Sequence, residues 1–224
     1  MTLRAVISKA AALPAPDGNW NAAPWGGVAP LELTHFRPEG TDHRPRVQVK
    51  LLHDGRAVGA FFRVEDRYVR SVQTELHSSV CTDSCVEWFT RPRPDKGYFN
   101  FEVNCGGTLH ASYIEDPSRA PSGFKKWRPL PADTCSQIEI AHSMPRVVEP
   151  EVAGPVTWTL ALRVPLAVFE EFVGPLAPLS GQTWTANFYK CGDKTSHRHW
   201  ASWAPVAELN FHRPQDFAPI AFAG

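Results

Sequence analysis

The sequence lacks a surplus of charge of either sign. Its 23 lysine and arginine residues are matched by 23 aspartate and glutamate residues, so the formal net charge at pH 7 is zero. A broad positive field is what draws proteins to nucleic acids and to anionic membranes. We therefore expect no nucleic-acid partner and no membrane partner. The partner should be neutral or recognised locally.

Long apolar runs and a recognisable export signal are also missing. No apolar run approaches the ~20 residues that a transmembrane helix needs. The N-terminal segment begins with an apolar stretch, but Lys9 interrupts it and Pro14 and Pro16 follow at once. That pattern differs from a signal peptide. We expect a cytoplasmic protein, although a leader that had already been removed would leave no trace in this sequence.

Cysteine is scarce. Five scattered cysteines, an odd number, do not make a disulfide framework in a chain of 224 residues. Cys81 and Cys85, with Cys105 and Cys191, invite comparison with zinc ligands. Four residues of extended strand span roughly 13 Å, too far for two thiolates on one ion unless a turn at Thr82-Asp83 shortens the distance. We expect reduced, buried cysteines. The GxSxG elbow, the phosphate-binding loop and the HExxH motif are also absent, which removes several classes of enzyme.

Aromatic residues and prolines, in contrast, are numerous. Eight tryptophans, thirteen phenylalanines and 21 prolines suit short strands joined by irregular loops. Alternating or β-rich runs predict strands at residues 3–8, 30–36, 45–54, 57–66, 85–90, 98–104, 108–116, 136–142, 156–164, 181–190 and 218–222. A short helix is predicted at residues 166–172, opened by Pro165 and ended by Gly174.

This pattern predicts one domain over residues 1–224, a two-layer antiparallel β-sandwich of the immunoglobulin or jelly-roll kind with one or two short helices. Asp54-Gly55 predicts the turn of a hairpin whose first arm has one dry and one partly wet face. Asp17-Gly18 predicts another turn, and Trp20 and Trp25 a short buttress against the core. Residues 117–134 are rich in polar residues and proline and predict an exposed loop.

The stretch from Thr82 to Asn104 concentrates the unusual chemistry. Glu87 is surrounded in sequence by the apolar residues Cys85, Val86, Trp88 and Phe89. A carboxylate is costly to bury among such residues unless it has a partner or a functional role. In the run from 98 to 104, the polar side chains share the face opposite to the apolar ones. If the two runs pair as a hairpin, Glu87 and Glu102 lie on one polar surface. Such a surface would suit a sugar or metal site.

Six short motifs, each weak alone, occur in an order that resembles carbohydrate-binding module family 9, within the wider DOMON-like group of sandwiches. They are Asp17-Gly18 followed by Trp20, DSCVEWF at 83–89, FEVN at 101–104, WTANFYK at 184–190, Trp203, and FHRPQDFAPIAF at 211–222. The resemblance covers almost the whole chain. It implies a β-sandwich that binds the ends of sugar chains in a concave site, usually as a module of a polysaccharide-degrading enzyme and often with structural calcium.

The resemblance also implies roles for individual residues. Glu87 matches the acid that binds sugar hydroxyls, whereas Glu102 falls where family members have a basic ligand contact. Asn187 lies on a strand that contributes a polar contact, and Phe211 lies where a stacking tryptophan is expected. The other half of the aromatic clamp would fall near Cys81, which is not aromatic.

Two further residues and one metal ligand complete the predicted site. Trp200 or Trp203, beside the HRH segment, can replace the missing stacking ring. Calcium can tie a loop, with Asp83 as a possible contributor, although no loop resembles an EF-hand.

The expected function is non-catalytic binding of a neutral mono- or oligosaccharide, tied to carbohydrate catabolism. Three alternatives stay open. Glu87 and Glu102 can form the acid/base pair of a glycoside hydrolase. His197 and His199 can bind a metal or a haem iron. The chain can also be an interaction sandwich whose site has decayed. For Glu87 itself, the alternative to ligand contact is a salt bridge with Arg91 or Arg93. The oligomeric state is not predicted.

Overall fold

The computed structural model describes residues 3–16, 19–121 and 123–224. Its first sheet contains β10 (Gly123–Pro129), β9 (Leu109–Ala120), β8 (Tyr98–Asn104), β7 (Cys85–Arg91), β14 (Thr183–Cys191), β16 (Ala218–Phe222) and β1 (Ala5–Lys9), in that order. The second sheet runs from β1 through β4 (Arg46–His53), β5 (Ala57–Asp66) and β13 (Val156–Pro165) to β11 (Glu139–His142). The predicted Asp17-Gly18 turn lies outside the described residues.

Shorter elements complete the chain. β15 (Trp200–Ser202) and β3 (His35–Phe36) extend the first sheet beside β14, β2 (Leu31–Glu32) pairs with β4, and β12 (Val148–Val152) pairs with β6 (Val69–Ser71). The helices are α1 (Ala132–Cys135) and α2 (Leu166–Val173), with 3₁₀ turns η1 (Trp25–Gly27), η2 (Val80–Thr82) and η3 (Pro214–Asp216).

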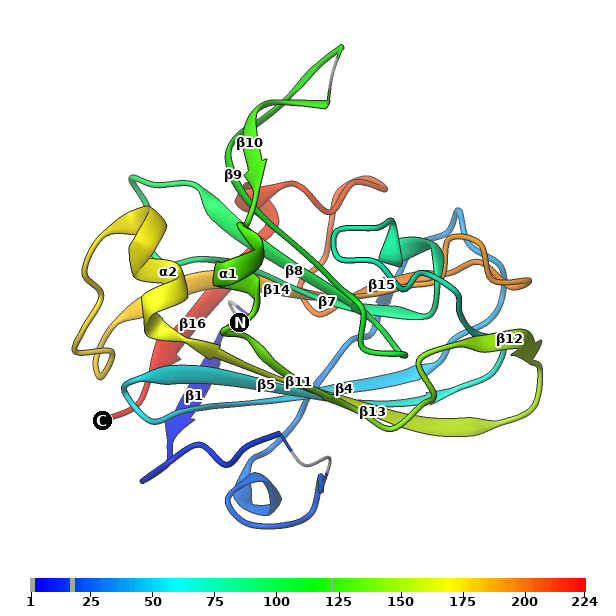
Figure 1. Cartoon of the computed structure of the whole chain (residues 1–224), viewed down its shortest axis with the longest axis horizontal. Helices are drawn as coiled ribbons and strands as arrows, with labels where there is room; N and C mark the ends of the chain where they lie inside the picture. Colours follow the sequence, from blue (N-terminus) through cyan, green and yellow to red (C-terminus); the bar gives the residue numbers. More distant parts are fainter. Residues whose placement is uncertain (1–2, 17–18, 122) are drawn as a thin grey trace.

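The two sheets lie face to face, with β7, β8 and β14 in one layer and β4, β5 and β13 in the other (Figure 1). Strand β1 joins the layers, because Ala5 to Ile7 pair with β16 whereas Ser8 and Lys9 pair with β4. The predicted all-β sandwich is therefore confirmed. It is not wholly antiparallel, since β1 runs parallel to both of its neighbours.

The core fills the space between the layers. Phe62 of the second sheet meets Phe188 of the first at a ring distance of 6.3 Å. The predicted helix is confirmed as α2, ended by Gly174 with a φ of 80°. Its Phe169 ring lies 6.0 Å from Trp88 and 5.2 Å from Trp184, so this helix packs onto the core side of the first sheet.

The hairpin around Gly55 is also confirmed, with β4 and β5 paired from Arg46–Glu65 to His53–Val58. The prediction that one face of its first arm is partly exposed to water is wrong. Lys50 is only 4% exposed and donates hydrogen bonds to the carbonyls of Trp20 and Trp25 at 3.1 and 2.9 Å. The segment that contains η1 covers this face, and both tryptophan rings pack edge-on against Phe61, as the predicted buttress requires.

The single strand predicted at residues 30–36 is divided in two. β2 pairs with β4 in the second sheet, whereas β3 pairs with β15 in the first. Leu33, between them, is buried in the main core. The chain crosses from one layer to the other at this point, so a continuous strand would not reach both partners.

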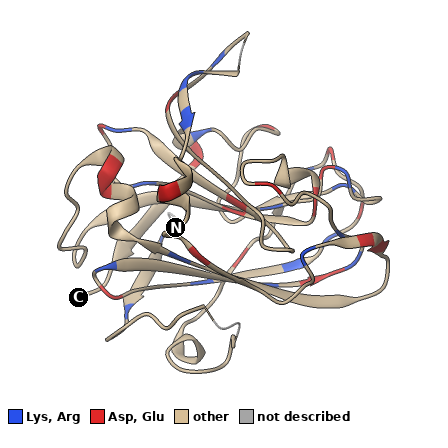
Figure 2. Cartoon of the chain, in the orientation of Figure 1, with Lys and Arg blue, Asp and Glu red and all other residues tan. Residues whose placement is uncertain are grey.

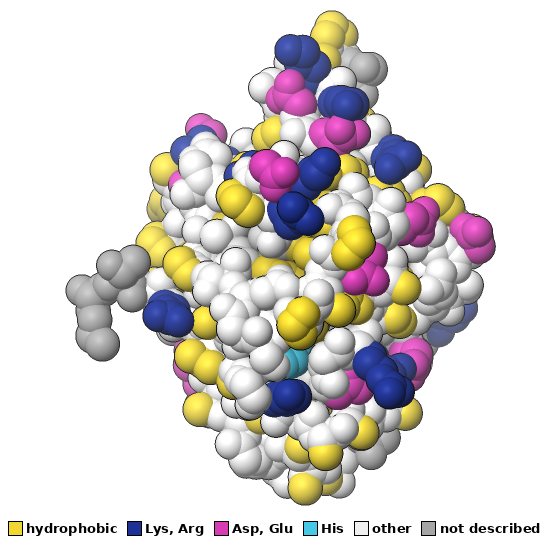
Figure 3. All heavy atoms as spheres, turned by 90° about the vertical axis from the view of Figure 1, so that its left-hand side faces the viewer, with side chains coloured by type: hydrophobic (Ala, Val, Ile, Leu, Met, Phe, Trp, Pro, Cys, Tyr) yellow, Lys and Arg dark blue, Asp and Glu magenta, His cyan; other side chains and the backbone are white. Residues whose placement is uncertain are grey.

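The prediction of a loop at residues 117–134 is wrong, because these residues mostly form regular secondary structure. Most of the segment forms the end of β9, β10 and α1, and the β9–β10 hairpin projects from the body of the molecule (Figure 1). Acidic and basic side chains lie side by side on this projection (Figure 3), where Lys126 pairs with Glu115 at 2.6 Å. Most side chains of β10 are exposed, and its polar sequence carries no alternation that predicts a strand.

Charges of both signs are interspersed along the chain (Figure 2), in keeping with the balanced composition. In the part of the chain that the structure describes, no helix has the length and apolar character needed to cross a membrane.

Two tryptophans of equal size and different burial test this core. Trp184 is 1% exposed and packs against Phe169 and Phe222, whereas Trp127 on the hairpin is 41% exposed. We expect Trp184→Ala to lower the free energy of unfolding by about 3–5 kcal/mol because it leaves a cavity, and Trp127→Ala by less than about 1 kcal/mol. Urea unfolding of both variants measures this. Equal losses would show that the core does not lie between the sheets.

Candidate ligand-binding cavity

A row of four outward-facing side chains crosses the first sheet. The strand registers place Tyr189 of β14 opposite Glu87 of β7, Glu87 opposite Glu102 of β8, and Glu102 opposite His110 of β9. The predicted hairpin and the shared face of the two glutamates are confirmed. Both are deeply buried, Glu87 at 2% and Glu102 at 8% exposed.

The two glutamates at the centre of this row form the floor of a cavity of about 340 Å³. Its walls come from η2, the loop after β14, β15, the loop at 209–212 and the projecting hairpin. The lining residues are Cys81, Glu87, Glu102, Arg119, Cys191, Asp193, Trp200, Leu209, Asn210, Phe211 and His212. The structure thus brings together four of the predicted ligand-binding residues: Glu87, Glu102, Trp200 and Phe211.

Two aromatic walls are fixed by their own contacts. The Phe211 ring stacks on Tyr189 with centroids 4.0 Å apart, and the Tyr189 hydroxyl donates to the Phe211 carbonyl at 3.2 Å. Trp200 is half-buried, and its Nε1 donates to Asp193 at 2.6 Å. Because these rings are held before any ligand arrives, binding against them requires little reordering.

Burial dominates the electrostatics of the floor. It raises the pKa of Glu87 well above its ordinary value, and the neighbouring charge of Glu102 raises it further. The Cys191 thiol donates to Oε1 of Glu87 at 2.9 Å and partly opposes this shift. Burial also raises the pKa of Glu102. The neighbouring His110 and a hydrogen bond of 2.7 Å from the Asn100 amide lower it, but burial outweighs them.

The predicted salt bridge from Glu87 to Arg91 or Arg93 is wrong. Arg91 donates to the backbone carbonyl of Lys96 at 2.8 Å, and Arg93 pairs with Asp95 at 3.5 Å. Both arginines lie at the far end of the hairpin from Glu87. The buried carboxyl group is therefore not explained by an ion pair with either of them.

Two predicted ligand contacts do not reach the cavity. Asn187 is fully buried, and its side-chain amide bonds the backbone N–H and carbonyl of Ala204 at 2.9 and 3.0 Å. It holds a loop against β14. Trp203 is 4% exposed and lies in the main core, 5.8 Å from Phe188. Neither side chain lines the cavity, so these two assignments are corrected.

Asp83, the predicted calcium ligand, also has another role. Its Oδ2 accepts hydrogen bonds from the N–H groups of Val72 and Gln73 and from the Asn104 amide, each at 2.9 Å. The Arg70 guanidinium lies 3.7 Å from its Oδ1. A calcium ion prefers several free oxygens and no neighbouring cation. These residues do not fit calcium, and Asp83 instead ties the loop that follows β6 to Asn104 at the end of β8.

Sequence patterns did not predict Asp193, Arg119, Asn210 or His212 in the cavity. Asp193 follows β14 in a turn, Arg119 lies on the hairpin, and the last two lie on the loop at 209–212. Only the position of Asp193 soon after the WTANFYK strand carried a local signal. Burial lowers the pKa of His212 to about 3, so this wall is neutral at neutral pH.

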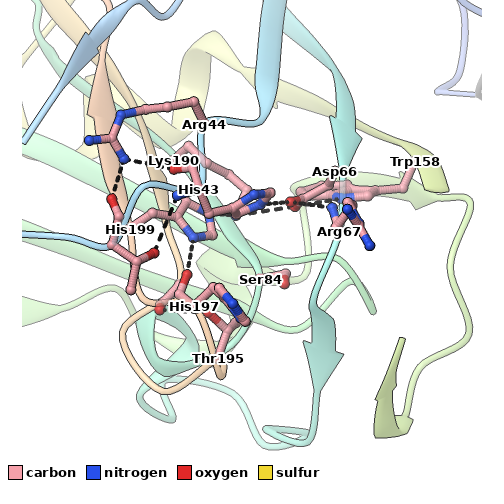
Figure 4. A network of polar contacts seen from close by, with 12 residues as sticks. His43, Arg44, Asp66, Arg67, Ser84, Trp158, Lys190, Thr195, His197 and His199 are labelled. Atoms are coloured by element: carbon pink, nitrogen blue, oxygen red, sulfur yellow. Dashed lines mark hydrogen bonds and ion pairs between the residues drawn. The ribbon is translucent and has the colours of Figure 1, made fainter. Parts of the chain in front are cut away.

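A second polar cluster lies between the two sheets (Figure 4). Asp66 at the end of β5 bonds His43 at 2.7 Å and faces the Lys190 ammonium at 3.5 Å. Lys190, itself fully buried, also donates to Nε2 of His199 at 2.8 Å. Burial opposes the charge of Asp66, but Lys190 and His43 outweigh it and lower the pKa of that carboxyl.

This cluster bears on the metal and haem alternatives. The ligand atoms of His43, Asp66 and His199 lie within 4.8 Å of one another. The Lys190 ammonium, however, occupies Nε2 of His199 and stands where a cation would have to bind. His197 stacks on Tyr68 with centroids 3.6 Å apart. The two histidines are therefore engaged in internal contacts, and the cluster is better described as an ion pair that ties β14 to β5.

The comparisons with known proteins agree with this geometry. The sequence profile of carbohydrate-binding family 9 matches residues 29–222. A solved structure described as a candidate carbohydrate-binding protein of Bacteroides uniformis is 26% identical, with a TM-score of 0.85 over 98% of both chains. The comparison with curated proteins gives no match.

Two further structures share the fold. Both are family 9 carbohydrate-binding modules from Caldicellulosiruptor kristjanssonii, one in complex with cellotriose and one with glucose. The first is 15% identical and covers 99% of this chain and 94% of that one; the second is 14% identical and covers 99% and 96%. Each has a TM-score of 0.67.

The buried ion pair gives a stability prediction. We expect Lys190→Met to lower the free energy of unfolding by about 3–5 kcal/mol, because it leaves the Asp66 carboxylate buried without its cation. Lys125→Met, on the exposed hairpin, is the control and should change it by less than about 0.5 kcal/mol. Urea unfolding at neutral pH compares them. A loss below about 1 kcal/mol for Lys190→Met would contradict this role.

For the carboxyl pair we predict a substitution that raises the free energy of unfolding, in contrast to Lys190→Met, which lowers it. A folded-state pKa raised above the unfolded value makes Glu87 lose stabilisation as pH rises through the folded pKa. Gln carries no such charge and still accepts a hydrogen bond from Cys191. We therefore expect Glu87→Gln to be more stable than the wild type at pH 8, by about 1 kcal/mol or more, and similar to it near pH 4. Urea unfolding at both pH values tests this, and a less stable variant at pH 8 would refute it.

Proposed function

The chain belongs to carbohydrate-binding family 9, and we propose that it binds the end of a small saccharide, without catalysis, in the cavity above Glu87 and Glu102. The observation that carries the proposal is the buried carboxyl pair on the floor of a cavity with two aromatic walls. Ligand cavities span about 300–1,000 Å³, and this one lies near the lower end of that range. Its volume suits one or two sugar rings.

The chemistry of the lining supports a sugar. Oε1 of Glu87 and Oε1 of Glu102 are each held by one donor, Cys191 and Asn100 respectively. Within the described residues no donor reaches the second oxygen of either side chain. Two such oxygens, side by side, can accept hydrogen bonds from vicinal hydroxyl groups. Trp200 and Phe211 can cover the apolar face of the ring.

The position of Trp200 supports its role as the stacking ring. Cys81, where the family resemblance leads one to expect an aromatic residue, lines the cavity as a half-buried thiol. Trp200 lines the same cavity from β15, with its indole N–H held by Asp193. We propose that Trp200 supplies the contact that Cys81 cannot.

Binding is favoured over hydrolysis by the placement of the two acids. Glu87 and Glu102 are directly opposed on adjacent strands and rise from one floor. The acid and the nucleophile or base of a glycosidase flank the scissile bond from two sides of the sugar. Side by side, these glutamates meet the same side of a ligand. The open cavity likewise favours ligand binding over a decayed site.

Three expectations from the sequence stay proposals. Saccharide catabolism is the process in which such a protein would serve, and the cytoplasm is its proposed location. Structural calcium stays a prediction of the family resemblance, with no role for Asp83. Dialysis against a chelator, followed by thermal unfolding with and without added calcium, would test the last of these.

The proposal predicts the effect of removing one wall. Calorimetric titration with glucose and with cellotriose should show binding to the wild type, and Trp200→Ala should weaken it about tenfold, equivalent to about 1.4 kcal/mol. Trp127→Ala, outside the cavity, is the matched control and should bind like the wild type. The proposal would be refuted if the wild type bound neither glucose nor cellotriose. It would also be refuted if Trp200→Ala bound them as tightly as Trp127→Ala. Heat that continues after saturation would instead indicate turnover.

A further inference from the structure

The charge of the cavity is unbalanced, unlike that of the whole chain. Glu87, Glu102 and Asp193 line it, against one permanently charged base, Arg119. Arg119 is exposed on the hairpin, with its guanidinium carbon 4.5 Å above the Phe124 ring. Among residues 3–16, 19–121 and 123–224, no ion pair reaches any of the three acids.

The three acids share a second feature. Each of them accepts a hydrogen bond from a neutral side chain: Cys191 for Glu87, Asn100 for Glu102, and Trp200 together with Cys81 for Asp193. These donors fix the carboxyl groups in place but neutralise none of them, because none is a cation. Glu87 and Glu102 are more than nine-tenths buried, and each keeps one oxygen that no donor of the described chain reaches.

The surrounding groups compensate the two glutamates only in part: His110 lowers the pKa of Glu102 and Lys190 that of Glu87, but burial outweighs both and keeps each pKa raised. His110 faces Glu102 across the strands, with its nitrogens 3.1 Å from the His77 carbonyl and 3.2 Å from the Ser112 hydroxyl. Tyr189, on the other side of Glu87, gives its hydroxyl proton to a backbone carbonyl. Lys190 is committed to Asp66 and His199 between the sheets.

We propose that the preferred ligand is an amino sugar whose protonated amine lies between Glu87 and Glu102. This inference rests on the proposed function and narrows its substrate class. A primary ammonium group carries three N–H donors and one positive charge, which matches two opposed carboxyl groups with free oxygens. Hydrogen bonds between ionised partners are roughly twice as strong as neutral ones.

The same arrangement ranks other sugars. A neutral sugar offers hydroxyl groups only, so it leaves the two acids uncompensated and should bind more weakly. An N-acetylated sugar has the same ring but a neutral amide in place of the ammonium. A uronic acid would add a negative charge to the cavity and should bind least.

The experiment compares four ligands on the purified protein by calorimetry at about pH 6.5: glucosamine, N-acetylglucosamine, glucose and glucuronic acid. We expect glucosamine to bind at least tenfold more tightly than glucose and N-acetylglucosamine. Glu102→Gln should reduce this ratio to about one. Glu115→Gln, the same substitution on the exposed hairpin, should leave the ratio unchanged. If Glu102→Gln does not fold, Glu87→Gln provides the same comparison.

The outcomes separate this inference from the proposed function. Equal affinity for glucose and glucosamine in the wild type would overturn the amino-sugar assignment and leave sugar binding intact. A preference for glucosamine that persists in both Glu102→Gln and Glu87→Gln would place the amine elsewhere and also overturn it. If none of the four sugars binds, the proposed function fails and this inference fails with it.

Discussion

The cavity depends on one constraint, the opposition of two carboxyl groups on neighbouring strands in a place from which water is largely excluded. Glu87 and Glu102 face each other across β7 and β8, and burial raises the pKa of both. Two such groups cannot both ionise without compensation. No cation of the described chain forms an ion pair with either group, and His110 and Lys190 offset the burial only in part, so a proton or a ligand must complete the compensation. The buried carboxyl pair therefore lowers the free energy of unfolding, and a ligand that compensates its charge would raise it again.

The rest of the structure keeps that pair in place. The opposite side of β7, β8 and β14 carries Trp88, Phe101 and Phe188, which belong to the core, so the floor cannot yield easily. Beyond the end of the row, Lys190 and Asp66 connect the two sheets. Parts of the walls are loops, and side-chain hydrogen bonds tether them: Tyr189 bonds the loop at 209–212, Asp193 bonds β15, and Asn187 bonds the segment after β15. A rigid floor with tethered walls favours binding without reordering.

Much of the sandwich could be predicted, because alternation and turn residues are local signals. They placed Glu87 and Glu102 on one surface and identified the helix before Gly174. They failed where contacts with segments distant in sequence determine whether a side chain is buried or a strand forms. Asn187 does point away from the main core, but a loop covers it there. Trp203 lies on a short segment without alternation, so its burial could not be inferred. The strand β10 forms because β9 pairs with it, and its own polar sequence shows no sign of this. Arg119 reaches the cavity only through the tertiary fold.

The most direct test of the ligand site is nuclear magnetic resonance of the ¹⁵N-labelled protein during titration with glucose. If the carboxyl pair is the floor of the site, the backbone amide shifts should change most at residues 85–88, 100–104, 190–193 and 209–212. These segments are distant in sequence, and each contributes at least one residue to the lining of the cavity. Saturable shifts confined to another surface, or no shifts at high glucose concentration, would contradict the assignment of this cavity as the sugar site.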